Sequence, residues 1–477
     1  QNPLPTPTWS RSEVMMRVDV ALVSGQCAEI SASKDMTVLE LRRRAEEFLG
    51  LRIKHLVTST GRVLCFLSTL GEEAVADGDC LTAISRQGAL VSSVGGAAFA
   101  LLKADGSVVA WGDASSGGHL SRSQEEQLND VEQICPSFGA FAAVAGNGRV
   151  ITWGDYDFGA DSQPVKHQLK DVKEVFATGF AFAALKKDGS VVTWGENYPG
   201  GDSRAVQDQL HDVKTIASSS LAFAAIRNDG SVVTWGSKNP SVDPEELQDV
   251  THIAGSHEAF CALRADGSCF TWGGAKFGGD SQKVQERLVG VRRVVGSNKA
   301  FCALRDDGQC VCWGDETCGG LVPPHVEAEL QGIRQIFASH GAFAAVRCDG
   351  KCITWGGEDY GGDSSAVQEK LANVQFVTPS KRAFCAVLMD GSVVSWGDRM
   401  RVAEMGDVQD QLYDVQHLVA SSNAFCAMRR DGCCVTWGDW RFGGDSSKVS
   451  QHLQNAMKRI KPRIKRSFSD TTLAIDR

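Results

Sequence analysis

The stretch that decides the fold is Ala183-Ala-Leu-Lys-Lys-Asp-Gly-Ser-Val-Val-Thr-Trp-Gly195. An Asp-Gly pair between two apolar runs is typical of a tight β-hairpin, because these residues tolerate the positive φ angles of its turn. We therefore expect a strand before Asp188, an antiparallel strand after Gly189, and a type I′ turn between them. A third apolar stretch, 213–217, alternates with period two and predicts a third strand.

This pattern repeats along most of the chain. Trp-Gly occurs nine times at spacings of 42, 41, 41, 37, 41, 42, 41 and 41 residues, and Asp or Asn followed by Gly precedes every Trp by six residues. Phe lies six residues further upstream in every unit. A fixed period of this length indicates a repeat architecture. The tryptophans are Trp111, Trp153, Trp194, Trp235, Trp272, Trp313, Trp355, Trp396 and Trp437, and the phenylalanines are Phe99, Phe141, Phe182, Phe223, Phe260, Phe301, Phe343, Phe384 and Phe425.

A glycine-rich segment follows Trp-Gly in most units, as in Gly200-Gly-Asp-Ser203. We expect Asp202 or Ser203 to cap a short helix that places Val206 and Leu210 on one face. A calcium loop is the alternative, but each segment carries one carboxylate and calcium takes six to eight oxygen ligands. The same interpretation applies to Asp280, Asp363 and Asp445.

A three-stranded sheet cannot bury both of its faces alone. Sheets stacked radially bury them against their neighbours, and closing the ring leaves only short edges. Residues 88–455 are therefore predicted to be mainly β, as a closed β-propeller of about nine 41-residue blades with three strands and a short helix each. An open superhelix is the alternative.

The unit resembles the regulator-of-chromosome-condensation repeat in its strand, its Asp-Gly turn and its Trp-Gly end. The resemblance covers residues 88–455, with two departures. The units are shorter than that family's usual repeat, and Phe stands where the family often has His followed by Ser or Thr. Nine units also exceed the common seven blades. The resemblance implies a protein-binding propeller, with guanine-nucleotide exchange on a small GTPase as a further alternative.

Residues 15–86 do not carry the repeat. Met16–Val23 and Cys27–Ala32 are predicted strands, and Thr37-Val-Leu-Glu40 is a capping box that opens a helix ending at Leu49. Further short strands are expected at 55–58, 63–66 and 80–84. The apolar stripe of the helix is predicted to comprise Val38, Leu41, Ala45, Phe48 and Leu49.

This order resembles ubiquitin, in the turn VSG, the helix MTVLELRRRAEEFLG and the segment STLGEEAVADGDCLTAI. The resemblance implies an α+β ubiquitin-like β-grasp domain over residues 15–86. This domain lacks the free C-terminal Gly-Gly that the resemblance associates with conjugation to other proteins. We therefore expect a module built into the chain rather than a conjugated modifier. By the same resemblance, Val23, Val57 and Ile84 would form the apolar protein-binding patch of the sheet. The alternative is that they are ordinary sheet residues.

Composition and charge narrow the class of protein. The net charge of −9 disfavours nucleic acid as the main partner, because phosphate contacts need a basic surface. No apolar run approaches the roughly 18 residues of a membrane span, and Gln1–Trp9 does not have the pattern of a signal peptide. Most of the 16 cysteines stand where other units carry Ala or Val. They predict free thiols in a reducing compartment, the cytoplasm or the nucleus.

The two ends are predicted to lack a fold, as a flexible segment 1–14 and a basic, disordered tail 456–477. Ser467 and Ser469 follow the basic run of that tail and are candidate phosphorylation sites. The run is a candidate targeting signal, with a phosphate-binding patch or a solvated tail as alternatives. It consists of Lys458, Arg459, Lys461, Arg463, Lys465 and Arg466.

No enzyme motif was found: there is no phosphate-binding loop and no His-Glu-x-x-His. The cysteines Cys310, Cys312, Cys433 and Cys434 lack zinc spacing and lie on predicted strands. We therefore expect neither metal nor cofactor, and a monomeric, non-catalytic scaffold that binds protein partners, ubiquitin-pathway components among them. The alternatives are a substrate-recognition part of a ubiquitin ligase, or a fragment of a larger one, and nucleotide exchange.

Overall fold

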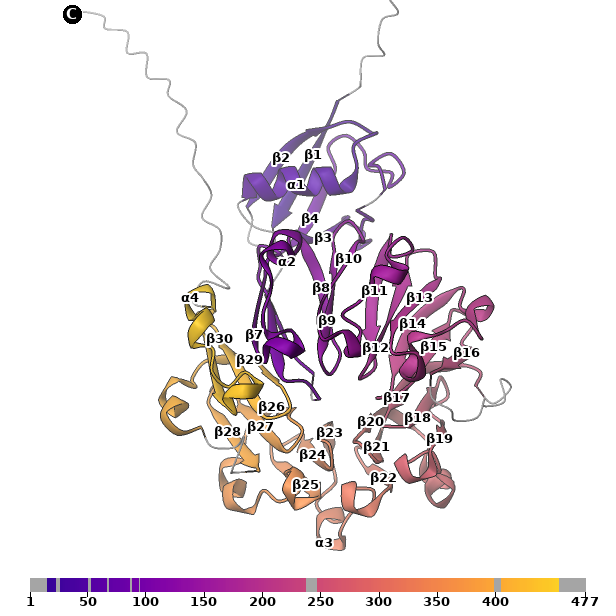
Figure 1. Ribbon diagram of the computed structural model, residues 1–477, viewed down its shortest axis with the longest axis vertical. Helices are drawn as coiled ribbons and strands as arrows, with labels where there is room; N and C mark the ends of the chain where they lie inside the picture. The colour runs from indigo at the N-terminus through magenta and orange to yellow at the C-terminus, as the bar shows by residue number, and fades with distance from the viewer. Residues whose placement is uncertain are drawn as a thin grey trace, which may run out of the picture. The chain divides into compact units, whose positions relative to one another are not determined.

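The computed structural model describes residues 15–22, 26–49, 53–66, 68–85, 88–93, 95–236, 247–398 and 405–453. These residues form two compact units, one within Gln1–Gln87 and the other within Gly88–Met457, and both are drawn in Figure 1. The predicted terminal segments 1–14 and 456–477 both lie outside the described residues. Within the described ranges, no helix has the length and apolar character needed to cross a membrane.

The first unit is a four-stranded mixed sheet with one helix. The strand order is β2-β1-β4-β3; β1 pairs antiparallel with β2 and parallel with β4, and β3 pairs antiparallel with β4. The predicted strands at both ends of this unit are therefore confirmed. The elements are β1 (Met16–Leu22), β2 (Cys27–Ala32), α1 (Val38–Leu49), β3 (Ile53–Val57) and β4 (Cys80–Ser85).

The helix α1 begins as predicted, since the Thr37 hydroxyl accepts a hydrogen bond from the Glu40 amide at 3.2 Å. Its buried face differs from the prediction, because Phe48 is 64% exposed. Arg42 and Glu46 are buried instead, one turn apart and paired at 3.5 Å. This ion pair occupies part of the face toward the sheet, so the helix turns Phe48 to solvent.

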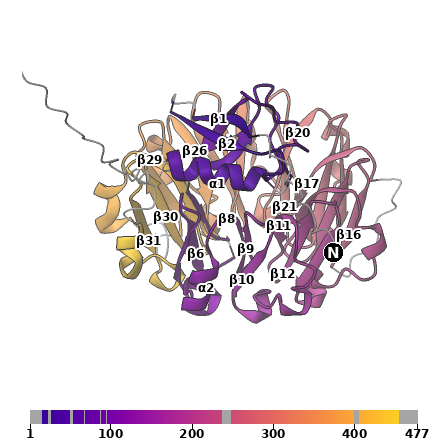
Figure 2. The same ribbon diagram turned by 90° about the horizontal axis from the view of Figure 1, so that it is seen from above.

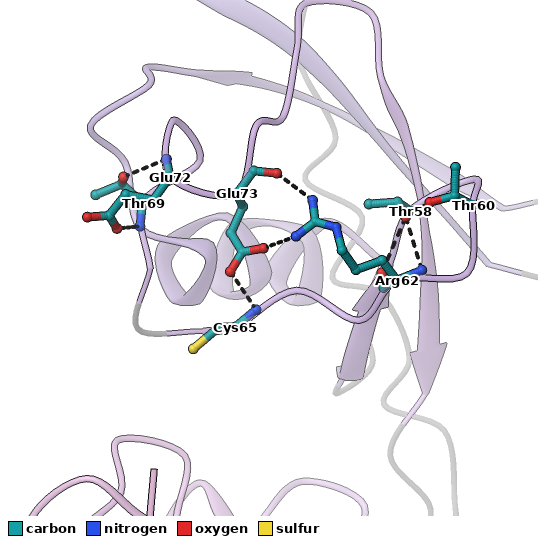
Figure 3. A network of polar contacts seen from close by, with 7 residues as sticks. All are labelled: Thr58, Thr60, Arg62, Cys65, Thr69, Glu72 and Glu73. Carbon is teal, nitrogen blue, oxygen red and sulfur yellow. Dashed lines mark hydrogen bonds and ion pairs between the residues drawn. The ribbon is translucent and has the colours of Figure 1, made fainter. Parts of the chain in front are cut away.

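The predicted strand at 63–66 does not form; only Val63 makes an isolated bridge, to Val57. Figure 3 shows a polar network around Glu73 that holds this segment. The Glu73 carboxylate accepts the Cys65 amide at 3.1 Å and forms an ion pair with Arg62, whose guanidinium also donates to the Glu73 carbonyl. The Leu64 amide keeps a ladder bond to the Leu56 carbonyl at 2.9 Å, but beyond it the Phe66 carbonyl accepts the Leu39 amide of α1 at 3.0 Å, so the pairing with β3 does not continue.

The second unit contains nine three-stranded antiparallel sheets in its described part, which follow one another in chain order around the unit (Figures 1 and 2). The first strands of neighbouring sheets contact each other around a complete cycle, which ends with β29 against β5. The inner wall of the ring is therefore made of first strands. The sheets are β5–β7 (Ala89–Val91, Ala98–Leu102, Val108–Gly112), β8–β10 (Val131–Pro136, Ala140–Ala145, Val150–Gly154), β11–β13 (Val172–Ala177, Ala181–Lys186, Val191–Gly195), β14–β16 (Val213–Ser218, Phe223–Arg227, Val232–Trp235), β17–β19 (Val250–Gly255, Ala259–Arg264, Cys269–Gly273), β20–β22 (Val291–Gly296, Ala300–Arg305, Cys310–Gly314), β23–β25 (Ile333–Ala338, Ala342–Arg347, Cys352–Gly356), β26–β28 (Val374–Pro379, Ala383–Leu388, Val393–Gly397) and β29–β31 (Val415–Ala420, Ala424–Arg429, Cys434–Gly438).

The repeated Phe and Trp of each unit pair directly across the second and third strands. Their rings stack at centroid distances of 5.1–5.5 Å and interplanar angles of 11–24° in all nine sheets. Most of these indole N–H groups reach the preceding sheet, as Trp355 Nε1 does to the Gly319 carbonyl at 3.1 Å. The last sheet meets the first in the same way, through Trp111 Nε1 and the Gly443 carbonyl at 3.2 Å.

The hairpin turn differs from the predicted type. Gly189 has a φ of 80°, whereas Asp188 does not adopt a positive φ. The Gly189 amide bonds the Lys186 carbonyl at 3.0 Å, and the Lys186 amide bonds the Ser190 carbonyl at 2.9 Å. This is a three-residue loop with glycine in the left-handed position. Asp188 has another role, since its carboxylate accepts the Ser190 amide at 2.9 Å.

The predicted helix cap after Trp-Gly is wrong in the unit on which it was based. Asp202 accepts the amide of Arg204 at 3.0 Å, and the Ser203 hydroxyl donates to Gln207 at 2.8 Å. The helix is a short 3₁₀ turn, Gln207–Gln209, without a side-chain cap. Other connections contain similar turns, and short α-helices occur at α2 (Arg122–Gln127), α3 (Pro324–Glu327) and α4 (Ser450–Leu453).

Two cysteines of one hairpin should differ strongly in reactivity. Cys348 is exposed and Cys352 is buried, and burial raises the pKa of the Cys352 thiol to about 12. At pH 8, about one Cys352 side chain in ten thousand is then a thiolate, the nucleophilic form. We expect iodoacetamide to label Cys348 in the native chain and Cys352 only after denaturation, as measured by peptide mass spectrometry. Equal labelling rates in the native chain would contradict this packing.

Candidate functional site

A belt of hydrogen-bonded turns runs around one end of the second unit. The belt comprises the turns between the first and second strands of each sheet, at 92–97, 137–139, 178–180, 219–221, 256–258, 297–299, 339–341, 380–382 and 421–423. A backbone amide of each turn but the first donates to a carbonyl of the next turn, as His257 does to Asn298 at 3.0 Å. The links close through Ser422 N to Gly96 O at 2.9 Å and Ser93 Oγ to Ser137 O at 2.7 Å.

A serine or threonine begins eight of these turns. Its buried hydroxyl interacts with the turn's own backbone, as Ser339 Oγ accepts the Ala342 amide at 3.1 Å. Several of these hydroxyls also donate to the loop after Trp-Gly, here to the Tyr360 carbonyl at 2.8 Å. The sequence analysis missed these residues, although the signal was present as Ser or Thr three residues before the Ala-Phe pair. They are Ser137, Thr178, Ser219, Ser256, Ser297, Ser339, Ser380 and Ser421.

The two residues after this hydroxyl differ from sheet to sheet, whereas the residues around them repeat. The belt therefore holds equivalent backbone positions in one geometry and gives each a different side chain. Because the fold needs only the backbone and the hydroxyl there, these positions are free for recognition. The pairs are Phe138-Gly139, Gly179-Phe180, Ser220-Leu221, His257-Glu258, Asn298-Lys299, His340-Gly341, Lys381-Arg382 and Ser422-Asn423.

One arc of the belt is aromatic. The rings of Phe138 and Phe180 lie 5.6 Å apart, edge to face, and Phe158 stacks on Phe180 at 5.1 Å. Glycine makes room for this cluster, since a Cβ at Gly179 would come within 2.6 Å of the Phe138 ring. All three phenylalanines are half-buried, so part of each ring remains available to a partner.

The facing arc is polar and carries Lys299, Lys381 and Arg382, all half-buried. Arg382 lies 3.6 Å from the Asp398 carboxylate, and its guanidinium carbon is 5.8 Å from the centroid of the Tyr360 ring. The two arcs together give the belt an apolar side and a side with cationic groups.

His340 lies in this cationic arc, and its titration should show the arrangement. Burial, together with the charges of Lys381, His257, Arg382 and Lys299, lowers the pKa of His340 to about 4. In the unfolded chain the imidazole is protonated below about pH 6.5, whereas in the folded chain it stays neutral down to about pH 4. The free energy of unfolding therefore decreases as the pH falls from 6.5 towards 4. We expect His340→Gln to flatten this loss in urea titrations at successive pH values. Unchanged pH dependence would contradict the assignment.

The predicted patch of the first unit is brought together in part. β3 and β4 pair with His55 opposite Ile84 and Val57 opposite Thr82, so Val57 and Ile84 lie on one face of neighbouring strands. Ile84 is 39% exposed and Val57 is half-buried, whereas the other face packs against the core. Val23 falls outside the described residues, as do both predicted phosphorylation sites and the basic run 458–466.

The cysteines considered as metal ligands lie on strands. Cys310 and Cys312 are half-buried on β22, and Cys312 Sγ lies 3.0 Å from Cys302 Sγ on the neighbouring strand. Cys433 precedes β31 and Cys434 begins it. Among the residues with described positions, no three His, Cys, Asp or Glu side chains gather in a way that could hold a metal ion.

Comparison with known proteins gives low similarity. No family model matches the chain and no curated protein matches it. Among solved structures, the chain is similar to the WD40 ectodomain of the receptor kinase ACR4 from Arabidopsis thaliana (19% identity, 57% of this chain, 94% of that chain, TM-score 0.36). It is also similar to Prp20p from Saccharomyces cerevisiae, described with its binding to Gsp1p and histones (16% identity, 69% of this chain, 80% of that chain, TM-score 0.33). A designed protein based on ubiquitin matches 15% of this chain and 89% of its own (22% identity, TM-score 0.14). Since every TM-score is below 0.5, the mainly β, propeller-like arrangement of three-stranded sheets rests on the topology of this chain itself.

Proposed function

We propose that this chain is a non-catalytic protein-interaction scaffold whose second unit, a closed nine-bladed β-propeller, binds a partner protein through the turn belt. One observation carries the proposal: equivalent positions of a closed, hydrogen-bonded belt carry side chains of different chemistry. The fold needs the paired Phe and Trp, which repeat, but not the side chains at these belt positions, which are therefore free to meet the surface of a partner. A rigid backbone with variable side chains is the arrangement by which folded domains present binding surfaces.

The chemistry of the belt describes the partner surface that fits it. Phe138 and Phe180 offer apolar rings, and Lys381 and Arg382 offer cationic groups at the facing arc. Aromatic and arginine side chains contribute most to protein interfaces. The partner surface that fits therefore presents an apolar side chain to the aromatic arc and a carboxylate to the facing, cationic arc.

The first unit is proposed to be a ubiquitin-like β-grasp module that recruits a second protein through Val57 and Ile84. Its support is the mixed sheet with one helix and the shared face of these two side chains on β3 and β4. An exposed isoleucine beside a half-buried valine on an open sheet face gives a small apolar contact area.

The test is quantitative affinity purification of the tagged 477-residue chain from its own cells. Lys381→Glu with Arg382→Glu reverses the cationic arc, and Lys186→Glu with Lys187→Glu, on a hairpin away from the belt, makes the same charge change as a control. We expect at least one partner to be lost from the belt variant and kept by the control. An identical partner set for both variants and the parent chain would overturn the belt assignment.

The first unit is tested in the same preparation with Val57→Arg and Ile84→Arg, and with Phe48→Ser as a control at an exposed apolar residue of α1. We expect a different set of partners to be lost in the Val57 and Ile84 variant. Loss of ubiquitin-pathway proteins would favour the ligase-associated role. A partner that proves to be a small GTPase would lead to a nucleotide-exchange assay, where no acceleration excludes that alternative.

A further inference from the structure

A cavity lies in the inner wall of the second unit and is lined by residues outside the turn belt. Its volume is about 320 Å³, within the size range of small-molecule sites. It opens between β17 and β18 of one sheet and β20 of the next. The lining comprises His252, Ile253, Ala254, Cys261, Leu263, Arg292, Arg293 and Val294, none of which belongs to the belt.

The cavity lies where a first strand carries a small residue near its end. Ala254 is the fifth residue of β17; this position holds Phe176 in β11 and Phe337 in β23, and smaller residues in β8, β14, β20, β26 and β29. Those two rings pack against the buried cores between their own sheet and the next. The alanine leaves that space unfilled, and the apolar walls of the cavity are formed by the neighbouring Ile253, Leu263 and others.

The polar part of the lining is cationic. The inner strands β17, β20 and β23 carry His252, Arg292, Arg293 and Arg334 and have no acidic residue, in a chain of net charge −9. Arg292 is held across the strands by a 2.9 Å hydrogen bond from Nη2 to the Ile333 carbonyl. Within the part of the chain that the structure describes, no carboxylate forms an ion pair with Arg292 or Arg293, although other surface arginines have such partners.

We propose that this cavity binds a small organic anion, with its apolar body against Ile253, Leu263 and Val294 and its oxyanion at Arg292 and Arg293. The planar guanidinium donates two parallel hydrogen bonds to a carboxylate or a phosphate, and two neighbouring guanidinium charges favour such a group over a neutral one. His252 adds a further donor at the rim. This binding site is separate from the proposed partner-binding belt and does not depend on it.

The test uses 1-anilinonaphthalene-8-sulfonate, an aromatic body with one oxyanion, and its neutral analogue N-phenyl-1-naphthylamine, with the full chain and fluorescence as the readout. We expect saturable binding of the anionic probe and at least tenfold weaker binding of the neutral one. Ala254→Phe, which fills the cavity and keeps its charge, should abolish saturable binding. Arg293→Gln should weaken it about tenfold. Lys214→Gln removes one charge from β14, outside the cavity, and should leave it unchanged.

Competition identifies the preferred oxyanion, since phenyl phosphate and benzoate share a ring and differ in the anion, and phenol carries none. Displacement by either anion and not by phenol supports the site, and the stronger competitor names the ligand class. Thermal unfolding of each variant shows that the fold is retained. Binding that is equal in the Ala254→Phe variant and the parent chain, or equal for the charged and neutral probes, would overturn the proposal.

Discussion

Replacing Phe343 by alanine is expected to lower the free energy of unfolding of the second unit by about 3–5 kcal/mol. The Phe343 side chain is fully buried and stacks on Trp355 at 5.5 Å in the core between two sheets. Gly319 lies so close that a Cβ there would meet the ring at 2.6 Å. Its backbone cannot collapse freely into the cavity, because the Trp355 indole is bonded to its carbonyl.

The measurement is urea unfolding of the full chain followed by tryptophan emission, because all nine Trp-Gly tryptophans lie in the second unit. The matched control is Trp440→Ala, which removes an aromatic ring that is 71% exposed. Surface changes of this kind alter stability by about 0.5 kcal/mol or less. Equal midpoints for the Phe343 and Trp440 variants would show that the stacked pairs do not hold the sheets together.

Replacing Arg42 by alanine is expected to destabilise the first unit by about 3–5 kcal/mol. The Arg42 side chain is fully buried beside Glu46, with its guanidinium 4.4 Å from the centroid of the Phe66 ring. Glu46 also accepts the Ile53 amide at 2.8 Å. Without Arg42, the buried Glu46 carboxylate loses the guanidinium that lies 3.5 Å from it.

Hydrogen exchange with mass spectrometry on the full chain reads this effect in peptides from α1 and β3. Arg43→Ala is the control, since Arg43 is exposed on the same helix. The double variant Arg42→Met with Glu46→Gln should lose less protection than Arg42→Ala, because both charges leave together. Unchanged exchange in Arg42→Ala would contradict the buried pair.

The sequence predicted the repeating strands because each depends on local signals: Asp-Gly at the hairpin, alternation in the first strand, and the paired Phe and Trp. The turn type was wrong because Asp-Gly alone does not set the loop length; the bond between the Lys186 and Ser190 backbones does. The exposure of Phe48 could not be predicted, because apolar periodicity does not reveal that an ion pair occupies the buried face.

The candidate sites were harder to predict than the fold. The belt depends on hydrogen bonds between turns about 41 residues apart. The repeat alone does not reveal these bonds, because they form only when the sheets are arranged side by side in a ring. The cavity depends on the small side chain of Ala254. No sequence motif marks a position where a larger side chain would have filled the space. A resemblance assigned Val57 and Ile84 to one sheet face, and the register of β3 and β4 places them on one face; their role in binding stays a prediction.

The closed belt makes the number of repeats a property of the whole unit. The Asp-Gly hairpins tie neighbouring sheets together as well, since the Val213 amide of β14 donates to the Gly189 carbonyl of the preceding hairpin at 3.0 Å. An added or deleted repeat changes the circumference, so every link must adopt a new angle between neighbouring sheets. Proteins of this design should therefore differ from one another by whole repeats, each with its own turn and hairpin links.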